Sequence, residues 1–390
     1  MLDKDRQKLE GLFFDFINQN EISVKPPLSF LPPKDDNSLY FTNATVANFK
    51  EDFLCGTPKH LATKQKCLRL HNTSKMLNDD YKVEWLSLFN MVGTIIPSSE
   101  LKDAKSNLIN LMINVYGIPR NKLVFMIDAK DENLVKDLPN DMLILNSHEQ
   151  KYYDWHFGCN NVKGKGLTFG VKQNDNTIVD VGNFIEITDD SHVLGYECAY
   201  GLECLLWAKE NKKSIFETYP IFSHFNSDNA NIAKIIDTLM SIAAIEDVGI
   251  EPTNKTSRGQ ILKKLYRNLV YLSEKSNFSD LHIAKVLDIL SETEFDSAVN
   301  TKNILSHFNQ SKTLVNCQRN AFLFHKKRLS DLYHDGVITI QEAEQKMLNW
   351  AEGKYYIDRH ERAKYFDLGI DKNQKPKADH SIIQNNCNER

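Results

Sequence analysis

Seven cysteines are scattered through the 390 residues, and none forms a CxxC pair or lies in a close His/Cys cluster. Such an odd, dispersed set predicts free thiols in a reducing compartment, hence a cytoplasmic protein, and argues against zinc. No apolar run approaches the roughly 18 residues that a membrane helix needs. The first twenty residues are charged and amphipathic, without the apolar core or cleavage site of a signal peptide. We therefore expect no metal site and no membrane association.

The sequence also has little excess charge. Lys and Arg number 48 and Asp and Glu number 52, so the net charge of −4 gives no indication of nucleic-acid binding. The common catalytic loops GxxxxGK[ST], GxGxxG, GxSxG and HExxH are all missing. The short glycine-rich run at 164–166 favours a turn over a phosphate-binding loop. Composition and general motifs thus leave the function open.

Hydrophobic periodicity does indicate the architecture. It predicts an amphipathic helix over 5–19, then several strands of an antiparallel sheet, and finally helices with almost no strand signal. The expected strands include 122–127, 141–145, 166–171, 177–181 and 184–187, and the expected later helices are 229–248, 258–275, 280–291, 301–309 and 341–352. We predict an α+β fold with a core domain over 1–220, an all-helical domain over 228–365 and a polar tail over 366–390.

Three blocks near the N-terminus carry the first functional signal. They are Leu39-Tyr40-Phe41-Thr42-Asn43-Ala44, Asn48-Phe49-Lys50 with Phe53-Leu54, and Thr63-Lys64-Gln65-Lys66-Cys67-Leu68-Arg69. Together they resemble the catalytic core of alanyl-tRNA synthetase, a class II aminoacyl-tRNA synthetase. The resemblance implies that Arg69 contacts the α-phosphate of ATP and the aminoacyl carboxylate, a task that suits a planar guanidinium. Without the resemblance, an arginine at a strand end would more often form a surface ion pair.

Further blocks resemble the amino-acid pocket of the same family. Trp155 and Gly158 match a segment whose Trp packs beside the substrate, and Asn183 matches an Asn facing the same pocket. Residues 196–204 match motif 3, with Glu197 where the family has the Asp that pairs with the substrate's amino group, and with Gly201 kept. We expect Trp155, Asn183, Glu197 and Gly201 to bind substrate. Alternatively, Trp155 is a core aromatic and Glu197 pairs with a lysine of the protein.

The helical half continues the resemblance, which covers about residues 5–350. Residues 257–268 resemble a helix of the domain that recognises the tRNA acceptor stem, so Arg258, Lys263, Lys264 and Arg267 are expected to bind tRNA. Helical spacing places Lys263, Lys264 and Arg267 opposite the apolar positions 261, 262, 265, 269 and 272. A second basic cluster lies at 326–328. The alternative is that both clusters are simply solvated surface.

Two departures fall in the ATP site. Cys204 stands where motif 3 has an arginine that clamps ATP, and Glu84 stands where motif 2 has an arginine. Loss of one such contact typically costs several kcal/mol of transition-state binding. ATP with magnesium is therefore expected only if adenylation is retained.

Three functions follow from these observations. The first is a diverged paralog that handles an amino acid such as alanine or an aminoacyl group, with tRNA as partner, acting as an unusual ligase or transferase. The second is a non-catalytic protein that binds tRNA or a partner synthetase. The third is an ATP-dependent alanine–tRNA ligase with a rewired nucleotide site.

Overall fold

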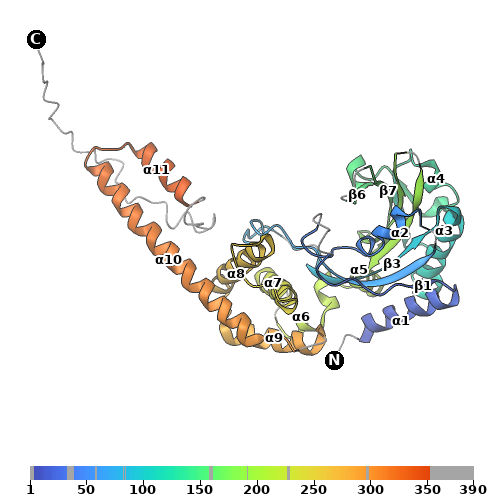
Figure 1. The fold of residues 1–390 in the computed structure, drawn as a ribbon, viewed down its shortest axis with the longest axis horizontal. Helices are drawn as coiled ribbons and strands as arrows, with labels where there is room; N and C mark the ends of the chain where they lie inside the picture. The colour runs from blue at the N-terminus through green and yellow to red at the C-terminus, as the bar shows by residue number, and fades with distance from the viewer. Residues whose placement is uncertain are drawn as a thin grey trace, which may run out of the picture.

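The computed structural model describes residues 4–32, 39–57, 59–81, 83, 85–157, 161–190, 192–225, 229–295 and 298–351. It shows a sheet of nine strands flanked by helices and followed by a helical region, which confirms the α+β class (Figure 1). The predicted tail over 366–390 lies outside the described residues, as do Glu84 and Gly158. In the described part of the chain, no helix is long and apolar enough to cross a membrane.

The sheet is mostly antiparallel, with a short parallel pair at each edge. Its strands are β1 (Ser23–Val24), β2 (Leu61–Leu68), β3 (Leu88–Ile96), β4 (Leu123–Ile127), β5 (Leu143–Leu145), β6 (Asp154–His156), β7 (Lys163–Lys172), β8 (Ile178–Thr188) and β9 (Val193–Gly201). The order is β1-β2-β3-β9-β8-β7-β4-β5, and β6 pairs with β7. The parallel pairs are β1–β2 and β4–β5. Strands β4 and β5 match the expected strands 122–127 and 141–145, whereas β1 and β6, of two and three residues, are too short to show a period in the sequence.

Two local expectations within the sheet are wrong. The segments 177–181 and 184–187 form one strand, β8, which continues through Gly182. Gly164 and Gly166 lie inside β7 rather than in a turn. A Cβ added to Gly166 would lie 2.4 Å from the carbonyl oxygen of Phe184 in the neighbouring strand. Glycine at this position lets the two strands approach closely. From the sequence alone, the same glycines had favoured a turn.

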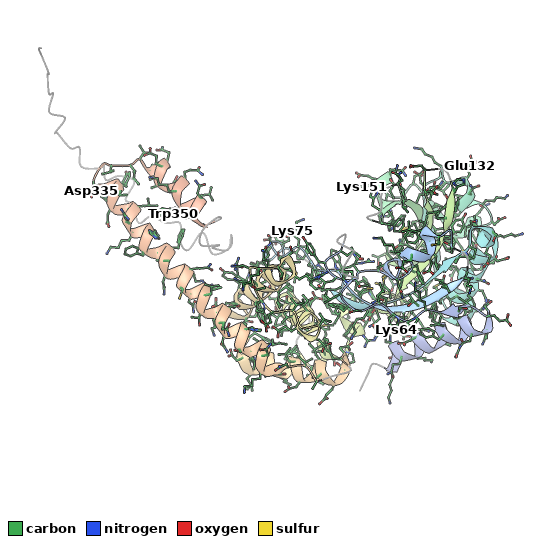
Figure 2. The ribbon with its side chains drawn as sticks, viewed as in Figure 1. Lys64, Lys75, Glu132, Lys151, Asp335 and Trp350 are labelled. Atoms are coloured by element: carbon green, nitrogen blue, oxygen red, sulfur yellow. The ribbon has the colours of Figure 1, made fainter. Side chains whose placement is uncertain are left out.

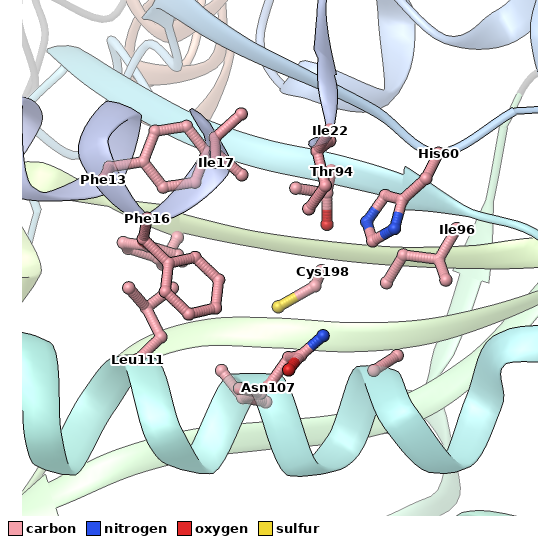
Figure 3. A pocket seen from close by; sticks show the side chains of 13 residues that line it. Phe13, Phe16, Ile17, Ile22, His60, Thr94, Ile96, Asn107, Leu111 and Cys198 are labelled. Carbon is pink, nitrogen blue, oxygen red and sulfur yellow. The ribbon is translucent and has the colours of Figure 1, made fainter. Parts of the chain in front are cut away.

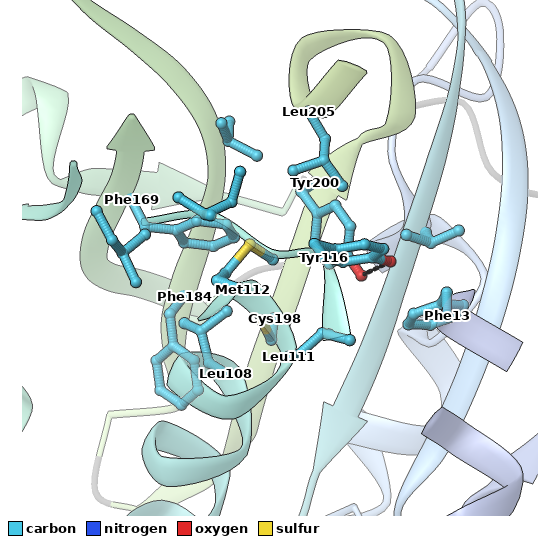
Figure 4. Close-up of a cluster of buried hydrophobic side chains, with 14 of the residues drawn as sticks. Phe13, Leu108, Leu111, Met112, Tyr116, Phe169, Phe184, Cys198, Tyr200 and Leu205 are labelled. Carbon is cyan, nitrogen blue, oxygen red and sulfur yellow. Dashed lines mark hydrogen bonds between the residues drawn. The ribbon is translucent and has the colours of Figure 1, made fainter. Parts of the chain in front are cut away.

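One face of the sheet packs against α1 (Lys4–Gln19), α3 (Leu101–Asn110) and the π turn η3 (Leu111–Val115). A cavity of only about 30 Å³ remains between these elements, beside His60 and Cys198 (Figure 3). Tyr196, Cys198 and Tyr200 of β9 point into this core, where the hydroxyls of Tyr116 and Tyr200 lie 2.8 Å apart (Figure 4). Because side chains alternate along a strand, the intervening residues of β9 face the opposite side.

Short helices cover the ends of the sheet. They are η1 (Thr45–Ala47), α2 (Lys50–Leu54), η2 (Ser98–Glu100), α4 (Glu132–Val135), η4 (Asn140–Met142) and η5 (Gln150–Tyr152). After β9 follow α5 (Leu202–Glu210), η6 (Ile215–Thr218) and α6 (Pro220–Ser223). The segment from η1 to α2 lies on the face opposite α1, where Phe49 and Phe53 pack against Ile95 and Ile187. That face is therefore closed at one end and available for a site at the other.

The helical region consists of α7 (Ala230–Asp247), α8 (Ser257–Lys275), α9 (Asp280–Thr293), α10 (Thr301–His334) and α11 (Ile340–Asn349). One hydrophobic cluster joins Leu68 and Leu88 of the sheet to α7, α8 and α9. Buried charges also bridge the two parts, because the Arg6 guanidinium lies 3.3 Å from Glu203 of α5 and 2.8 Å from Glu294 after α9. The domain limits 1–220 and 228–365 stay predictions.

Helix α10 is far longer than the expected 301–309. It runs away from the rest of the molecule, with Asp335 just beyond its far end and Trp350 just after the returning α11 (Figures 1 and 2). Its buried side chains recur about every seven residues and are Ile304, Phe308, Val315, Phe322 and Leu329. Such a narrow seam gives a weak hydrophobic signal, so the sequence indicated only the first part of the helix.

Candidate functional site

The open face of the sheet carries most of the predicted site residues. Glu197, Ala199 and Gly201 of β9 face away from the α1 core, Asn183 of β8 lies opposite Ala199, and Met91 of β3 lies opposite Gly201. A Cβ added to Gly201 would meet Cys204 Sγ at 3.4 Å as its nearest neighbour, which is ordinary contact. Gly201 is itself buried, so it contributes backbone rather than exposed surface to this face.

Arg69 follows β2 and its side chain extends over β3. Its backbone N–H donates to Ser87 O at 2.8 Å, and its Nε donates to Asn43 O at 2.8 Å. The guanidinium lies 5.2 Å from the centroid of the Phe89 ring, and Nη2 lies 3.6 Å from Met91 Sδ. Arg69 is exposed, and no carboxylate among the described residues pairs with it. An oriented guanidinium without a carboxylate partner is suited to bind an anion.

Glu197 is 3 % exposed and already has two donors. Its carboxylate accepts a hydrogen bond from Thr45 Oγ1 at 2.8 Å and another from the backbone of Val46, both in η1. Burial raises the pKa of Glu197 to about 7, although these two hydrogen bonds and the charge of Arg69 act in the opposite direction. The alternative partner weighed from sequence, a lysine of the protein, does not pair with Glu197 within the described ranges.

A chain of polar side chains crosses the same face beside Glu197. Asn183 Nδ2 donates to Thr168 Oγ1 at 2.9 Å, and a hydrogen bond links Thr168 to the Tyr152 hydroxyl. Tyr152 in turn donates to Asp180 Oδ2 at 2.6 Å. Burial, followed by the bond to Asp180, raises the pKa of Tyr152, so its proton stays on the phenol. Asn183 thus has the partner that a polar residue in a strand requires.

Tyr152 and Asp180 were not identified as site residues from the sequence. Asp180 lies in the block that identified Asn183, and a period of two would have placed it on the other face. The register of β8 shifts here, because Gly182 pairs with Phe169 and Asp180 with Gly170, which leaves Val181 as an extra residue in a β-bulge of β8 itself. Because Val179 and Val181 both point into the α1 core, Asp180 faces the site side and is exposed. The bulge, which sequence patterns do not show, is what brings Asp180 to this face.

Trp155 lies at the other end of the site face. It is half-buried in β6 opposite Gly164, and Gly164 lies opposite Ile187 of β8. Ile187 is four residues beyond Asn183 along β8, which corresponds to roughly 13 Å. The structure therefore brings Arg69, Asn183 and Gly201 to one region of the sheet and leaves Trp155 away from it.

Cys204 lies in the first turn of α5, next to Gly201. Its side chain is half-buried, and burial together with the charge of Glu203 raises the pKa of its thiol to about 12. Arg69 and Asp180 are the other two charges that act on this thiol, in opposite directions. The position expected to hold a cationic clamp is thus occupied by a neutral group.

The four cations expected to bind RNA have different environments on α8. Arg258 Nε donates to Tyr40 O at 2.7 Å, and Lys263 Nζ donates to Asn254 Oδ1 at 2.9 Å. Lys264 is exposed and Arg267 is half-buried. The apolar positions 262, 265, 269 and 272 are buried, as the helical spacing predicts, while 261 is half-buried. Lys264 is the cation of this set that is presented most freely to solvent.

No group of three or more metal-ligating side chains comes together in the part of the chain that the structure describes. On the α1 side of the sheet, the cavity of about 30 Å³ has room for roughly one water, and a wider hollow of about 790 Å³ lies between α1, the segment 24–30 and β2. The predicted residues Arg69, Asn183 and Gly201 gather on the opposite face, which is our candidate site.

Comparison with known proteins gives relatives of one kind, although no protein-family model matches the chain. The alanine–tRNA ligase of Blochmanniella floridana is 22% identical over 390 residues, covering 84% of this chain and 43% of the relative. That of Elusimicrobium minutum is 24% identical over 354 residues, covering 77% and 40%. The mitochondrial alanine–tRNA ligase of Dictyostelium discoideum is 28% identical over 165 residues, covering 39% and 17%. The chain thus spans at most about two fifths of the length of these relatives.

Proposed function

We propose that this alanyl-tRNA synthetase-like chain binds a small amino acid or aminoacyl group on the open sheet face and binds tRNA through its helical region. It would act as an unusual aminoacyl ligase or transferase. The observation that carries the proposal is the placement of Arg69. Its exposed guanidinium is oriented by Asn43 and Phe89, has no carboxylate partner among the described residues, and contacts Met91, which lies opposite Gly201.

The nucleotide end of the site supports transfer rather than ordinary ATP-dependent activation. Cys204 supplies no positive charge, because its thiol is neutral at physiological pH. Removing one preorganised donor from a developing oxyanion typically costs about 3–4 kcal/mol. ATP with magnesium would then be bound weakly, and the aminoacyl group would have to be activated by another enzyme.

Exposed cations on two helices support tRNA as the partner. Lys264 of α8 and the pair Lys327 and Arg328 of α10 are all exposed. Recognition of a paired RNA stem depends mainly on shape and on contacts to phosphates and 2′-hydroxyls, which such cations can provide.

A non-catalytic tRNA-binding protein is the second candidate. It is favoured by the neutral thiol at position 204 and by the commitment of Glu197 to Thr45, because both leave the site short of the charges that the family resemblance implies.

Two measurements test these proposals. The first is amino-acid-dependent ATP–pyrophosphate exchange with a panel of amino acids, and the second is tRNA binding at graded salt concentrations. We expect no exchange above background, amino-acid binding that Arg69→Met abolishes, and tRNA binding that weakens with salt. Robust exchange would instead show an orthodox ligase.

Lys264→Ala should weaken tRNA binding, whereas Lys8→Ala, an equal charge change at an exposed position of α1, should not. Firm tRNA binding without any amino-acid binding would establish the second candidate, and the absence of both activities would refute the two proposals together.

A further inference from the structure

The carboxylate of Glu197 is closed off from the site by η1. Thr45 Oγ1 donates to it, and the side chain is 3 % exposed. Thr45 is tightly seated, since a Cβ added to Gly93 beneath it would lie 2.7 Å from its Oγ1. A ligand ammonium could reach Glu197 only by displacing Thr45. Glu197 therefore holds η1 in place, and another group must receive the positive end of an amino acid.

Asp180, unlike Glu197, is exposed to solvent on the site face. It is exposed on the site side of β8, and Tyr152 fixes its orientation through a hydrogen bond of 2.6 Å to Oδ2. Within the described ranges, no cation pairs with Asp180, and no donor contacts its Oδ1. An oriented carboxylate with a free oxygen is suited to accept a hydrogen bond from an ammonium group.

The strand order sets the separation of the backbones beneath Arg69 and Asp180. The Arg69 guanidinium lies over Phe89 of β3, and one strand, β9, separates β3 from β8. Two strand spacings amount to about 10 Å. An α-amino acid with a charge-assisted hydrogen bond at each end spans roughly 9 Å. Gly201 ends β9, the strand that lies between β3 and β8.

Cys204 lies in the first turn of α5, directly after β9, the strand between β3 and β8. The family resemblance places an arginine at this position. An arginine there would pair with Asp180, whereas the neutral thiol leaves Asp180 available to a ligand.

We propose that Asp180, oriented by Tyr152, receives the α-ammonium group of the bound amino acid or aminoacyl group, while Arg69 receives its carboxyl end. This inference rests on the proposed function and specifies its binding mode. The ligand then lies across Gly201 and beside Cys204, and Glu197 acts only as a positioning residue for η1.

Calorimetric titration of the full chain tests this binding mode. The probes are L-alanine, propionate, which lacks the ammonium group, and L-alaninamide, which lacks the carboxylate. We expect Asp180→Asn to weaken L-alanine and L-alaninamide by 10-fold or more and to leave propionate unchanged. Tyr152→Phe should weaken the same two probes several-fold. Glu197→Gln should change the affinity for L-alanine less than twofold.

The outcomes separate this inference from the proposed function. If Glu197→Gln weakens the ammonium-bearing probes and Asp180→Asn does not, the inference is overturned and the proposed function stands. If Asp180→Asn weakens propionate equally, Asp180 does not act through the ammonium group and the inference is overturned as well. If the unmodified chain binds neither L-alanine nor glycine nor L-serine, both fall together.

Discussion

Replacing Glu197 by Gln should abolish a pH dependence of stability that arises inside the sheet. Burial raises the pKa of Glu197 from 4.5 to about 7 in the folded chain, so the folded state holds this proton more tightly than the unfolded state. The free energy of unfolding therefore falls as the pH rises from about 4.5 to about 7. At 1.36 kcal/mol per pKa unit, Glu197 should account for a loss of about 3 kcal/mol.

Urea denaturation of the two proteins at pH 4.5, 6, 7 and 8 measures this effect as a difference. The stability of the unmodified chain relative to Glu197→Gln should fall by about 3 kcal/mol across that range. Glu294, whose pKa burial also raises to about 7, contributes equally to both proteins and cancels. Glu149→Gln, at an exposed position, is the control and should run parallel to the unmodified chain. If the profiles of Glu197→Gln and the unmodified chain are also parallel, Glu197 is not held as a buried carboxyl group.

Four further substitutions test other parts of the structure. Arg6→Met should lower the free energy of unfolding by about 3–5 kcal/mol in urea, because two buried carboxylates lose their cation. Gly182→Ala should cost about 1–3 kcal/mol in the same assay, since its Cβ would lie 2.4 Å from Ala199 O. Met347→Ala should cost about 2–3 kcal/mol between α10 and α11, and limited proteolysis should then detect release of α11 with an unchanged urea midpoint for the sheet. Lys264→Ala should reduce the slope of log K against log salt concentration for tRNA binding by about 1, the effect of losing one phosphate contact, as measured by titration at several ionic strengths.

The helices were largely predictable, because their buried faces repeat with a period of 3.6, whereas strands β2, β3 and β9 were not among the strands named from the sequence. Helix α1 and helices α7 to α9 lie within a few residues of their predicted limits. What the sequence did not show were features without a period. Edge strands of two or three residues, glycines that allow strands to approach, and the narrow apolar seam of α10 all belong to this class.

A site residue was predictable only where it matched the family pattern and where the register of its strand followed the simple alternation of faces. Arg69, Asn183 and Gly201 reach the same face, as the family resemblance implied. Trp155 does not join them, because the pairing of β6 with the end of β7 was not visible in the sequence. Asp180 was missed because the bulge at Val181, the next residue of the same strand, reverses its side. Register and bulges depend on contacts between strands, which a single strand's sequence does not specify.

Two arginines that were assigned to different ligands hold the same segment of the chain. Arg69 donates to Asn43 O and Arg258 of α8 donates to Tyr40 O, so the residues between them connect the open sheet face to the helical region. The Nε of each arginine is thereby used within the protein, and only the outer nitrogens can reach a ligand. A contact that pulled Arg258 toward a phosphate would release Tyr40 and loosen the support of Arg69. The two halves are therefore joined at the site itself, as well as through the buried charges around Arg6.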